Sequence, residues 1–315
     1  FQGYGFNKAH AASYGNLAFQ TAYMKANFPV DYMAAVLTAD AGDVEKVAEI
    51  VAECKRMLIE VMPPSVQSSF GDFTVLDDNK IRFGLHSIKN FGTGVGDSII
   101  AAREKGGAFV DISDFLSRIA DKNLNKKSLE SLIKGGALDE MGERGQLLAN
   151  IDVLLNFHRE HIKTPSDQAS LFGAAVASPM KLKLTPSAEA HVDDRLTWEK
   201  ELLGLYVSGH PLDKHREKLA NEKNTIKHAK ENLVGVETVI AGLIESTQMI
   251  LTKNGERMGF LKIADYSGDI EAVVFPRVLK ENESLIIAGT CIKVKGRISE
   301  RNGEPSFVID KAKAL

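Results

Sequence analysis

The first 60 residues of the chain place apolar side chains at the spacing of helices. Between residues 11 and 27 they are so dense that we predict a well-buried helix, which Pro29 ends. A second helix is expected from Val30 to Ala39. From Val44 to Leu58 the apolar positions recur on one face behind Asp43, which predicts an amphipathic helix with an N-cap. The stretch FTVLDDNKIRFGL that follows predicts a β-hairpin.

Residues 84–160 show a different pattern, in which four or five short helices alternate with glycine turns. The stretch NFGTGVGDS has glycines at every second position before a helix, and Asp97 or Ser98 is the expected cap. Two further short helices are expected in VDISDFLSRI and NKKSLESLIKGG, the second closed by its glycine pair. A single longer helix is then predicted, with an apolar stripe formed by Leu147, Leu148, Ile151, Leu154 and Leu155.

Between residues 162 and 192 the periodicity disappears, which is typical of a functional or disordered connection. This segment contains QASLF, where Leu171 and Phe172 stand side by side with no nearby pattern to bury them. Two interpretations remain open. Either the pair folds back onto a neighbouring helix, or it enters a pocket of a partner protein. In that pocket, burial contributes about 1.5 to 3 kcal/mol per side chain, and Gln168 supplies a polar contact.

Order resumes with a helix predicted from Asp194 to Val207, which Asp193 and Asp194 cap and which Gly209 and Pro211 end. In about the last 80 residues the pattern changes to period two, with turn signals between most of the runs and one short helix after the third. Five strands and a helix in this length predict a small barrel of the oligonucleotide-binding (OB) type. The predicted fold class is multidomain α+β, mostly α-helical with a helix-hairpin-helix in the first two-thirds, followed by a five-stranded OB-type β-barrel.

The composition excludes several classes of protein. The 39 Lys and Arg against 42 Asp and Glu leave a net charge of -3, so any nucleic-acid binding has to be local. The two cysteines lie far apart, which argues against a disulfide framework and favours a reducing, cytoplasmic setting. No apolar run reaches the length of a membrane span, and the start lacks the pattern of a signal peptide. Because the chain begins without Met and in mid-pattern, we expect a fragment.

The glycine turn admits three interpretations. It lacks the Lys-Ser/Thr end of a P-loop, which disfavours a nucleotide enzyme, while a plain tight turn between core helices stays open. We favour a helix-hairpin-helix, in which glycines let backbone N–H groups approach a nucleic-acid phosphate before a helix N-terminus. For the glycine pair in LIKGGALD the plain turn is favoured. The residues expected at the duplex backbone are Lys89, Gly92, Thr93, Gly94, Val95 and Gly96.

Aromatic and basic residues of the predicted barrel are candidates for single-stranded DNA. The aromatic candidates for base stacking are Phe260, Tyr266 and Phe275. Aromatic residues on strands more often face the core. Lys293, Lys295 and Arg297 alternate with apolar residues and so share an exposed face, which fits backbone contacts or a merely solvated surface. The residues expected at single-stranded DNA are Arg257, Phe260, Lys262, Lys293, Lys295 and Arg297.

No pattern predicts a metal site or a catalytic site. His158 and His161 are one helical turn apart, but nothing completes a metal site around them, and an exposed helix surface is the expected explanation. The sequence offers no nucleophile with a plausible base and no convincing carboxylate cluster for two-metal phosphoryl transfer.

Three segments together resemble the bacterial replicative DNA polymerase III alpha subunits, in that family's order. FNKAHAASYGNLAFQTAYMKANFPVDYMAAVLT resembles the end of the fingers domain. IRFGLHSIKNFGTGVGDSIIAAREKGGAF with LNKKSLESLIKGGALDEMG resembles the tandem helix-hairpin-helix region, and WEKELLGLYVSGHPLD with the barrel resembles the connector and OB domain. The expected parts are the end of the fingers at 1–83, the helix-hairpin-helix region at 84–162, a linker with a clamp-binding motif at 163–193, a helical connector at 194–235 and the OB domain at 236–315.

The resemblance implies the C-terminal part of a DNA-directed DNA polymerase, a nucleotidyltransferase of DNA replication. Its implied partners are primer-template duplex, single-stranded template, the sliding clamp (the beta subunit) and other replisome subunits, with no membrane. QASLF is similar to the family's internal clamp-binding motif, which implies that Gln168, Leu171 and Phe172 enter a cleft on the clamp. Lys8 and His10 fall in a part of the fingers near the incoming nucleotide.

The family's phosphoesterase-like domain and its palm, whose aspartates hold metal ions, are absent from this sequence. The chain alone is therefore expected to hold no metal or cofactor and to be inactive, whereas the full-length polymerase is expected to need magnesium. A stand-alone clamp-binding and DNA-binding adaptor without catalysis is the alternative. A small nucleotide-using enzyme built on the glycine turn is the third hypothesis.

Overall fold

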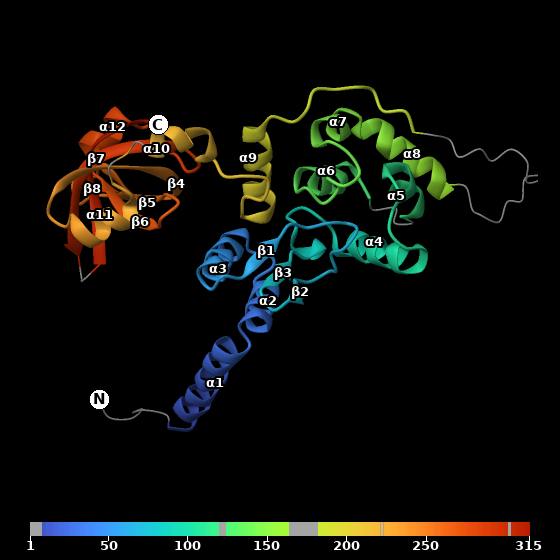
Figure 1. Ribbon diagram of the computed structural model, residues 1–315, viewed down its shortest axis with the longest axis horizontal. Coiled ribbons are helices and arrows are strands. Elements are labelled where there is room, and N and C mark those ends of the chain that lie inside the picture. The colour runs from blue at the N-terminus through green and yellow to red at the C-terminus, as the bar shows by residue number, and fades with distance from the viewer. Residues whose placement is uncertain (1–7, 120–123, 164–181, 221, 223, 302–303) are drawn as a thin grey trace, which may run out of the picture. The chain divides into compact units, whose positions relative to one another are not determined.

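The computed structural model describes residues 8–119, 124–163, 182–220, 222, 224–301 and 304–315 (Figure 1). The chain forms two compact units, Phe1–Ser208 and Gly209–Leu315, and each is described by itself. The first is mainly helical with a small sheet, and the second contains a closed five-stranded barrel. This arrangement confirms the predicted fold class.

The first helix, α1 (Lys8–Asn27), forms where it was predicted, but the prediction that it is well buried is wrong. None of its residues is buried, and the side chains of Tyr14, Leu17 and Phe19 are more than half exposed. The apolar residues surround the helix instead of forming one stripe, so no single face packs it onto the unit. The density of apolar residues was enough to predict the helix, but it was not enough to predict whether the helix is buried.

The next two helices, α2 (Pro29–Ala39) and α3 (Val44–Arg56), pack into the core of the first unit. Asp43 is the N-cap of α3 as predicted, and its carboxylate accepts hydrogen bonds from two backbone N–H groups of the first turn. The helix ends two residues before Leu58, because this residue takes a left-handed φ of 62° that a helix cannot continue.

A three-stranded sheet follows. The predicted hairpin consists of the antiparallel strands β2 (Thr74–Asp77) and β3 (Lys80–Arg82). A third strand, β1 (Glu60–Met62), pairs in parallel with β3. The sequence did not predict β1, because three residues are too few for an alternating pattern to stand out.

Short helices form the rest of this region after a 3-10 turn at Leu85–Ser87. They are α4 (Thr93–Gly106), α5 (Ile112–Arg118), α6 (Lys126–Lys134), α7 (Arg144–Ala149) and α8 (Ile151–Lys163). The predicted cap of α4 is wrong, because the helix already begins at Thr93 with Gly92 as its N-cap. The carboxylate of Asp97 instead lies 3.0 Å from Nε2 of His86.

The single longer helix predicted after the second glycine pair is two helices, α7 and α8. They meet at Asn150, whose side-chain amide exchanges two hydrogen bonds with the backbone of Thr185, at 2.8 and 2.9 Å. The side chain thus holds the returning chain against the junction, which sequence periodicity cannot reveal. The apolar stripe itself lies in the core, as predicted.

The last helix of the first unit, α9 (Val192–Leu203), differs from its prediction at both ends. Its N-cap is His191, so the acidic pair predicted as the cap lies in the first turn. It ends at Gly204, which has a left-handed φ of 79°. A Cβ atom there would lie 2.4 Å from the carbonyl oxygen of Val44, so only glycine fits.

The second unit begins with η2 (Asp213–His215), α10 (Arg216–Ala220) and α11 (Ile226–Asn232). The barrel strands are β4 (Glu237–Leu251), β5 (Arg257–Ala264), β6 (Asp269–Val274), β7 (Cys291–Arg301) and β8 (Glu304–Ala314). Helix α12 (Pro276–Glu281) follows the third strand, as predicted. The order β4-β5-β6-β8-β7 closes because β7 also pairs with β4, and β6 and β8 run parallel.

Candidate nucleic-acid interface

The glycine turn before α4 presents an open helix N-terminus. Gly92 is the N-cap in an extended conformation, and no side chain caps the helix. The carbonyl oxygen of Gly92 accepts hydrogen bonds from the N–H groups of Val95 and Gly96, at 3.1 and 3.3 Å. Thr93 and Gly94 are exposed, and their N–H groups have no partner among the described residues. Two free donors at the positive end of a helix suit an anion such as phosphate.

The structure separates the residues predicted at the duplex backbone into two groups. Lys89 is exposed beside the open turn. Val95 and Gly96 are buried, and a Cβ atom on Gly96 would lie 2.8 Å from Cδ2 of His86. Gly96 therefore allows close packing under the turn and does not face solvent.

Sequence reasoning missed His86, whose ring supports the glycine turn. The ring lies beneath Gly96, and a Cβ atom on Gly71 would lie 2.5 Å from its Cε1 atom. Its Nε2 atom lies 3.0 Å from a carboxylate oxygen of Asp97, in the second turn of α4. These contacts hold the first two turns of α4 against the 3-10 turn that contains His86. No local pattern links residues so far apart in the sequence.

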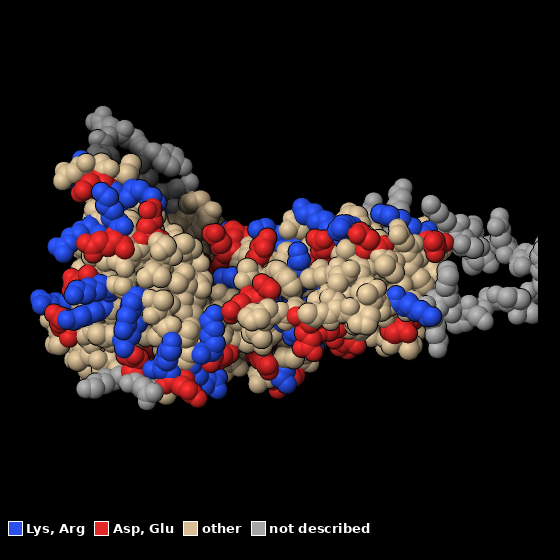
Figure 2. Space-filling view, turned by 90° about the horizontal axis from the view of Figure 1, so that it is seen from above, with Lys and Arg blue, Asp and Glu red and all other residues tan. Residues whose placement is uncertain are grey.

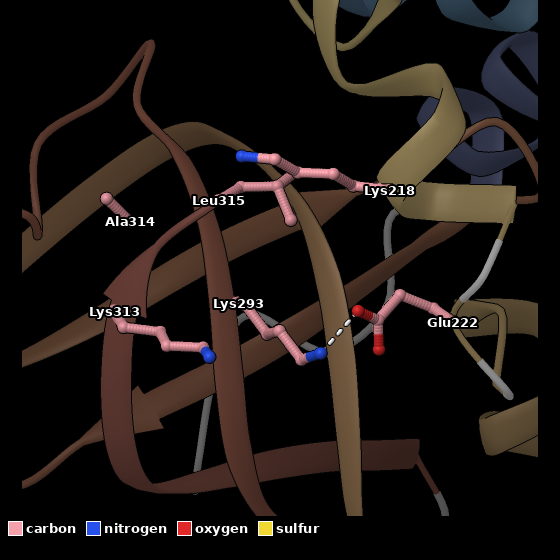
Figure 3. Close-up of a pocket in the computed structure, with 6 residues that line it drawn as sticks. All are labelled: Lys218, Glu222, Lys293, Lys313, Ala314 and Leu315. Atoms are coloured by element: carbon pink, nitrogen blue, oxygen red, sulfur yellow. Dashed lines mark hydrogen bonds and ion pairs between the residues drawn. The ribbon is translucent and has the colours of Figure 1, made fainter.

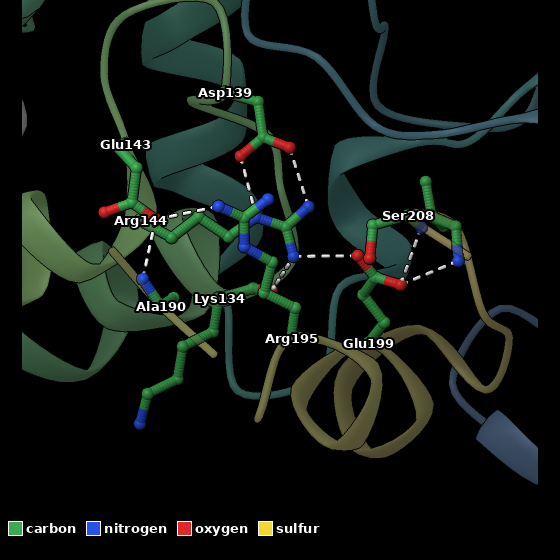
Figure 4. Close-up of polar contacts among 9 residues, drawn as sticks. Lys134, Asp139, Glu143, Arg144, Ala190, Arg195, Glu199 and Ser208 are labelled. Carbon is green, nitrogen blue, oxygen red and sulfur yellow. Dashed lines mark hydrogen bonds and ion pairs between the residues drawn. The ribbon is translucent and has the colours of Figure 1, made fainter. Parts of the chain in front are cut away.

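The second glycine pair is a packed turn, as favoured from the sequence. Gly135 and Gly136 are buried, and Gly136 has a φ of 80°. Behind this turn lies the guanidinium of Arg144, which donates to both carboxylate oxygens of Asp139, at 2.7 and 2.6 Å (Figure 4). A buried arginine fills the space where a phosphate would have to approach.

The same guanidinium connects this turn to α9 (Figure 4). Arg144 donates to Oε1 of Glu199 at 2.8 Å, and Oε2 of Glu199 accepts the backbone N–H groups of Val207 and Ser208, at 2.7 and 2.9 Å. Burial lowers the pKa of Arg144, but its bonds and charge contacts with Asp139 and Glu199 outweigh burial and raise the pKa above its ordinary value. The guanidinium is thus a permanent cation that fixes three segments together.

Glu143, next to this arginine, ties the returning chain to α7. Its carboxylate caps α7 and also accepts hydrogen bonds from the N–H of Ala190 and from Arg195, both at 2.9 Å. Burial raises the pKa of Glu143, while these bonds lower it, and the net pKa lies below the ordinary value. The chain that leads into α9 is therefore anchored to α7.

On the barrel, Phe260 and Lys262 share the outward face of β5, because Leu261 and Ile263 point into the core. Phe260 pairs with Val273 on β6, and Lys262 lies 3.2 Å from Glu245. Phe260 and Lys262 therefore form a row on the outward surface of β5.

The other residues predicted around β5 do not join this row. Arg257 belongs to the opposite alternation and forms an ion pair with Glu283 at 2.9 Å. Tyr266 is exposed, but its hydroxyl donates to Asp213 at 2.7 Å. This bond, followed by others, lowers the pKa of Asp213. Phe275 is exposed at the N-cap of α12.

The basic residues of β7 alternate as predicted. Lys295 and Arg297 are exposed and Lys293 is half-buried, while the residues between them are buried. The two lysines are not free, since Lys293 forms an ion pair with Glu222 and Lys295 with Glu237. The space-filling view shows rows of Lys and Arg interleaved with carboxylates over the barrel (Figure 2).

Several predicted residues lie elsewhere. Gln168, Leu171 and Phe172 are outside the described residues. Lys8 and His10 are exposed on α1, but positions two apart point to different sides of a helix, so the structure does not bring them together.

The prediction of an exposed histidine pair on α8 is wrong for one member. His158 is buried, and its Nδ1 atom lies 3.0 Å from the carbonyl oxygen of Leu116, which secures α8 to α5. Within the described ranges, no group of three or more His, Cys, Asp or Glu residues is placed to hold a metal ion. No helix of the described part of the chain is long and apolar enough to cross a membrane.

Comparison with protein families finds two matches in the chain. The family described as "Helix-hairpin-helix motif" matches residues 58–147, which include the open turn and the packed glycine turn. The family described as "OB-fold nucleic acid binding domain" matches residues 238–315, which form the barrel. A solved domain of replication protein A from Methanococcus maripaludis covers 27% of this chain and 89% of its own at 13% identity, but its TM-score of 0.24 supports no conclusion.

Curated relatives match almost the whole chain. The DNA polymerase III subunit alpha of Vibrio cholerae is 35% identical over 304 residues, which cover 95% of this chain and 26% of the relative. That of Campylobacter jejuni is 38% identical over 333 residues, covering 100% of this chain and 27% of the relative. The chain thus spans about a quarter of the length of the relatives that it matches. It belongs to the family of the DNA polymerase III alpha subunit.

Proposed function

We propose that this chain holds DNA and the sliding clamp for a replicative DNA polymerase and carries no catalytic step itself. The open N-terminus of α4 is the observation that carries the proposal. It combines two free N–H donors, an exposed lysine at residue 89 and a match to the helix-hairpin-helix family. Contacts of this kind position duplex DNA through its phosphates without reading its sequence.

The barrel is the proposed site for single-stranded template. Its support is the match to nucleic-acid-binding OB folds, together with Phe260 and Lys262 on the outward face of β5 and the basic residues of β7. Stacking on an aromatic ring beside a charged surface suits single strands of any sequence. We predict weak sequence preference for this reason.

The proposed clamp contact consists of Gln168, Leu171 and Phe172. Its support is the apolar pair in a segment whose return is anchored to the first unit by Asn150 and Glu143. Burial of two apolar side chains in a clamp cleft would contribute about 1.5 to 3 kcal/mol each. A tether of this kind turns each rebinding to DNA into an intramolecular event, so a weak contact suffices for processivity.

Nucleotide transfer is proposed to take place outside this chain. The described residues offer no carboxylate cluster for magnesium, so the ion expected for the polymerase would be held elsewhere. The contact of Lys8 and His10 with the incoming nucleotide stays a prediction, because it depends on the part of the polymerase that would hold the magnesium.

The proposal is tested by measuring binding of the whole chain to three fluorescent probes, namely a primer-template junction, a blunt duplex and a single strand. We expect the junction to bind most tightly. Lys89→Gln should weaken duplex binding and lower the slope of log affinity against log salt by about 0.9, the value for one lost phosphate contact. Lys55→Gln, an exposed lysine on α3, is the matched control. Equal slopes for both variants, or no binding by the wild type, would reject the proposal for DNA.

Clamp binding is tested separately with the cognate clamp immobilised on a sensor. Leu171→Ala with Phe172→Ala should abolish the interaction while the circular dichroism spectrum and the affinity for DNA stay unchanged. Unaltered clamp affinity of the double variant would defeat the assignment of this motif.

A further inference from the structure

Lysines face each other across β7 and β8 of the barrel. The register of the two antiparallel strands places Lys293 opposite Lys313 and Lys295 opposite Lys311. We call these four residues the lysine ladder. Lys295, Lys311 and Lys313 are exposed and Lys293 is half-buried. The KVKGR and KAKAL stretches thus place two lysine pairs, the rungs of the ladder, on one outward surface. Of these two strands, only β7 was predicted to be basic.

Like charges directly opposite each other destabilise a strand pair unless something neutralises them. Within the chain this role falls to two carboxylates, since Glu222 binds Lys293 and Glu237 binds Lys295. Lys311 and Lys313 have no ion-pair partner among the residues that the structure describes. Each rung therefore holds one neutralised and one free cation.

The electrostatics of Glu237 support this geometry. Its pKa is lowered, first by the hydrogen bond from Lys295 and then by the charge of Lys295, with further contributions from Arg297 and Lys311. The pKa of Lys295 is raised, first by its hydrogen bond to Glu237 and then by the charge of Glu237, and the charge of Asp310 adds to the rise. A single glutamate thus stands in the field of three cations.

An open pocket lies at one end of the ladder (Figure 3). Lys218 of α10, Glu222, Lys293, Lys313 and the last two residues of the chain line it. In Figure 3 the side chains of Lys293 and Lys313 lie side by side, and Glu222 reaches the first of them. Three lysines and one glutamate thus line the pocket, and the carboxylate of Glu222 is paired with Lys293.

The sheet register connects this basic surface to an aromatic one. Arg297 follows the ladder on β7 and pairs with Val308 on β8, which pairs with Val273 on β6 and through it with Phe260. Val273 is buried but lies outside the barrel core, as expected for an outward residue covered by its neighbours. A charged track that leads to a stacking ring fits an extended single strand better than a folded acidic protein.

From this geometry we infer that the lysine ladder binds consecutive phosphates of single-stranded nucleic acid, and that Glu222 and Glu237 occupy the same cations until the phosphates displace them. The inference rests on the proposed binding of single-stranded DNA by the barrel. It assigns the contact to β7 and β8, and it identifies Glu222 and Glu237 as the groups that compete with the phosphates. The usual binding face of an OB fold lies on its second and third strands, whereas the ladder lies on the fourth and fifth. Binding strength is then set by carboxylates of this chain as much as by its lysines.

The test uses the whole chain and a fluorescent oligothymidylate long enough for one OB site, which takes about 4 to 16 nucleotides. Lys311→Gln with Lys313→Gln should lower the salt slope by about 1.4, from about 0.7 per phosphate contact on a single strand. Lys227→Gln with Lys280→Gln is the matched control, because both lysines are exposed on α11 and α12. A slope equal to that of the control would overturn the inference.

A second pair of variants tests the competing groups in the opposite direction. Glu222→Gln with Glu237→Gln should raise the affinity about two- to thirtyfold, because it releases Lys293 from a partly buried ion pair and Lys295 from an exposed one. Glu231→Gln with Glu281→Gln is the matched control, because it removes two negative charges at helix positions outside the ladder. It should change the affinity less. Equal gains from both double variants would reduce the ladder to an effect of net charge and overturn the inference.

The outcomes separate the inference from the proposal on which it rests. Failure of the wild type to bind oligothymidylate would reject the proposed binding of single strands and the ladder with it. Normal wild-type binding with an unaltered slope in the Lys311 and Lys313 variant would reject the ladder alone. Polyglutamate of equal charge should compete poorly, and competition as strong as that of the oligonucleotide would contradict a phosphate site.

Discussion

An acidic N-cap in α4 should stabilise the chain and weaken its binding to duplex DNA. Gly92 is an N-cap without a side-chain bond, and its φ of -83° and ψ of 136° are open to any residue. A Cβ atom at Gly92 would meet nothing within 4 Å. In Gly92→Asp the new carboxylate would therefore accept the free N–H of Gly94 without strain, at the place proposed for a phosphate.

The two effects of this substitution have opposite signs. A capping side chain in place of glycine adds a few tenths of a kcal/mol, and a negative charge at a helix N-terminus adds about 0.3 to 1 kcal/mol. The free energy of unfolding should thus rise by about 0.5 to 1.5 kcal/mol, measured by urea denaturation. The affinity for a blunt duplex should fall about tenfold or more, because the carboxylate both occupies the N–H of Gly94 and repels the phosphate.

Gly92→Asn is the matched control, since its side chain has the same size and caps the helix without charge. It should raise stability by a few tenths of a kcal/mol and weaken duplex binding less than the aspartate. Fluorescence anisotropy at several salt concentrations measures both affinities. If the aspartate variant becomes more stable but binds duplex as tightly as the wild type, the open N-terminus is not the phosphate site.

Three further predictions concern stability and reactivity. Arg144→Met should lower the free energy of unfolding by about 3 to 5 kcal/mol in urea, because it leaves a fully buried carboxylate without its cation, and a loss below about 1 kcal/mol would contradict this reasoning. Burial raises the pKa of Cys54 to about 11, so iodoacetamide at pH 8 should modify Cys291 first, and equal rates would refute the prediction. The hydrogen bond from Arg56, the largest of several contributions, lowers the pKa of Glu53 to about 2 from 4.5. Its stabilising effect is therefore present above pH 4.5 and is lost as the pH falls towards 2, so the difference in melting temperature between the wild type and Glu53→Gln should shrink over that range.

Local pattern was enough to predict most elements of the fold. Period-two alternation predicted the strands of the barrel, and the cap at Asp43 marked the start of α3. The pattern failed where a tertiary contact decides the outcome. Asn150 divides one apolar stripe into two helices because it bonds to a backbone 35 residues later, and Gly204 ends α9 against Val44. Neither partner is visible in a window of sequence.

The same dependence on tertiary contacts limited the prediction of the candidate site. The glycine turn was predictable because glycine spacing before a helix is a local signal, but the sequence did not distinguish the exposed Gly92 and Gly94 from the buried Gly96. His86, which fills the space that Gly96 leaves, is ten residues away and carries no signal of its own. The Lys311 and Lys313 rungs repeat the alternation of the preceding strand, so that signal was present in the sequence and was missed.

A strand pattern assigns a charged residue to a face, but it does not say whether that charge is free. Lys293 and Lys295 were predicted on the exposed face and lie there, yet their partners come from 71 residues earlier and from a neighbouring strand. The field that a phosphate meets is the sum of both signs, so counting lysines overestimates it. For this barrel, removing a carboxylate is therefore the more informative experiment than removing a lysine. A loss of binding follows from many kinds of damage, whereas a gain requires that the carboxylate had been competing.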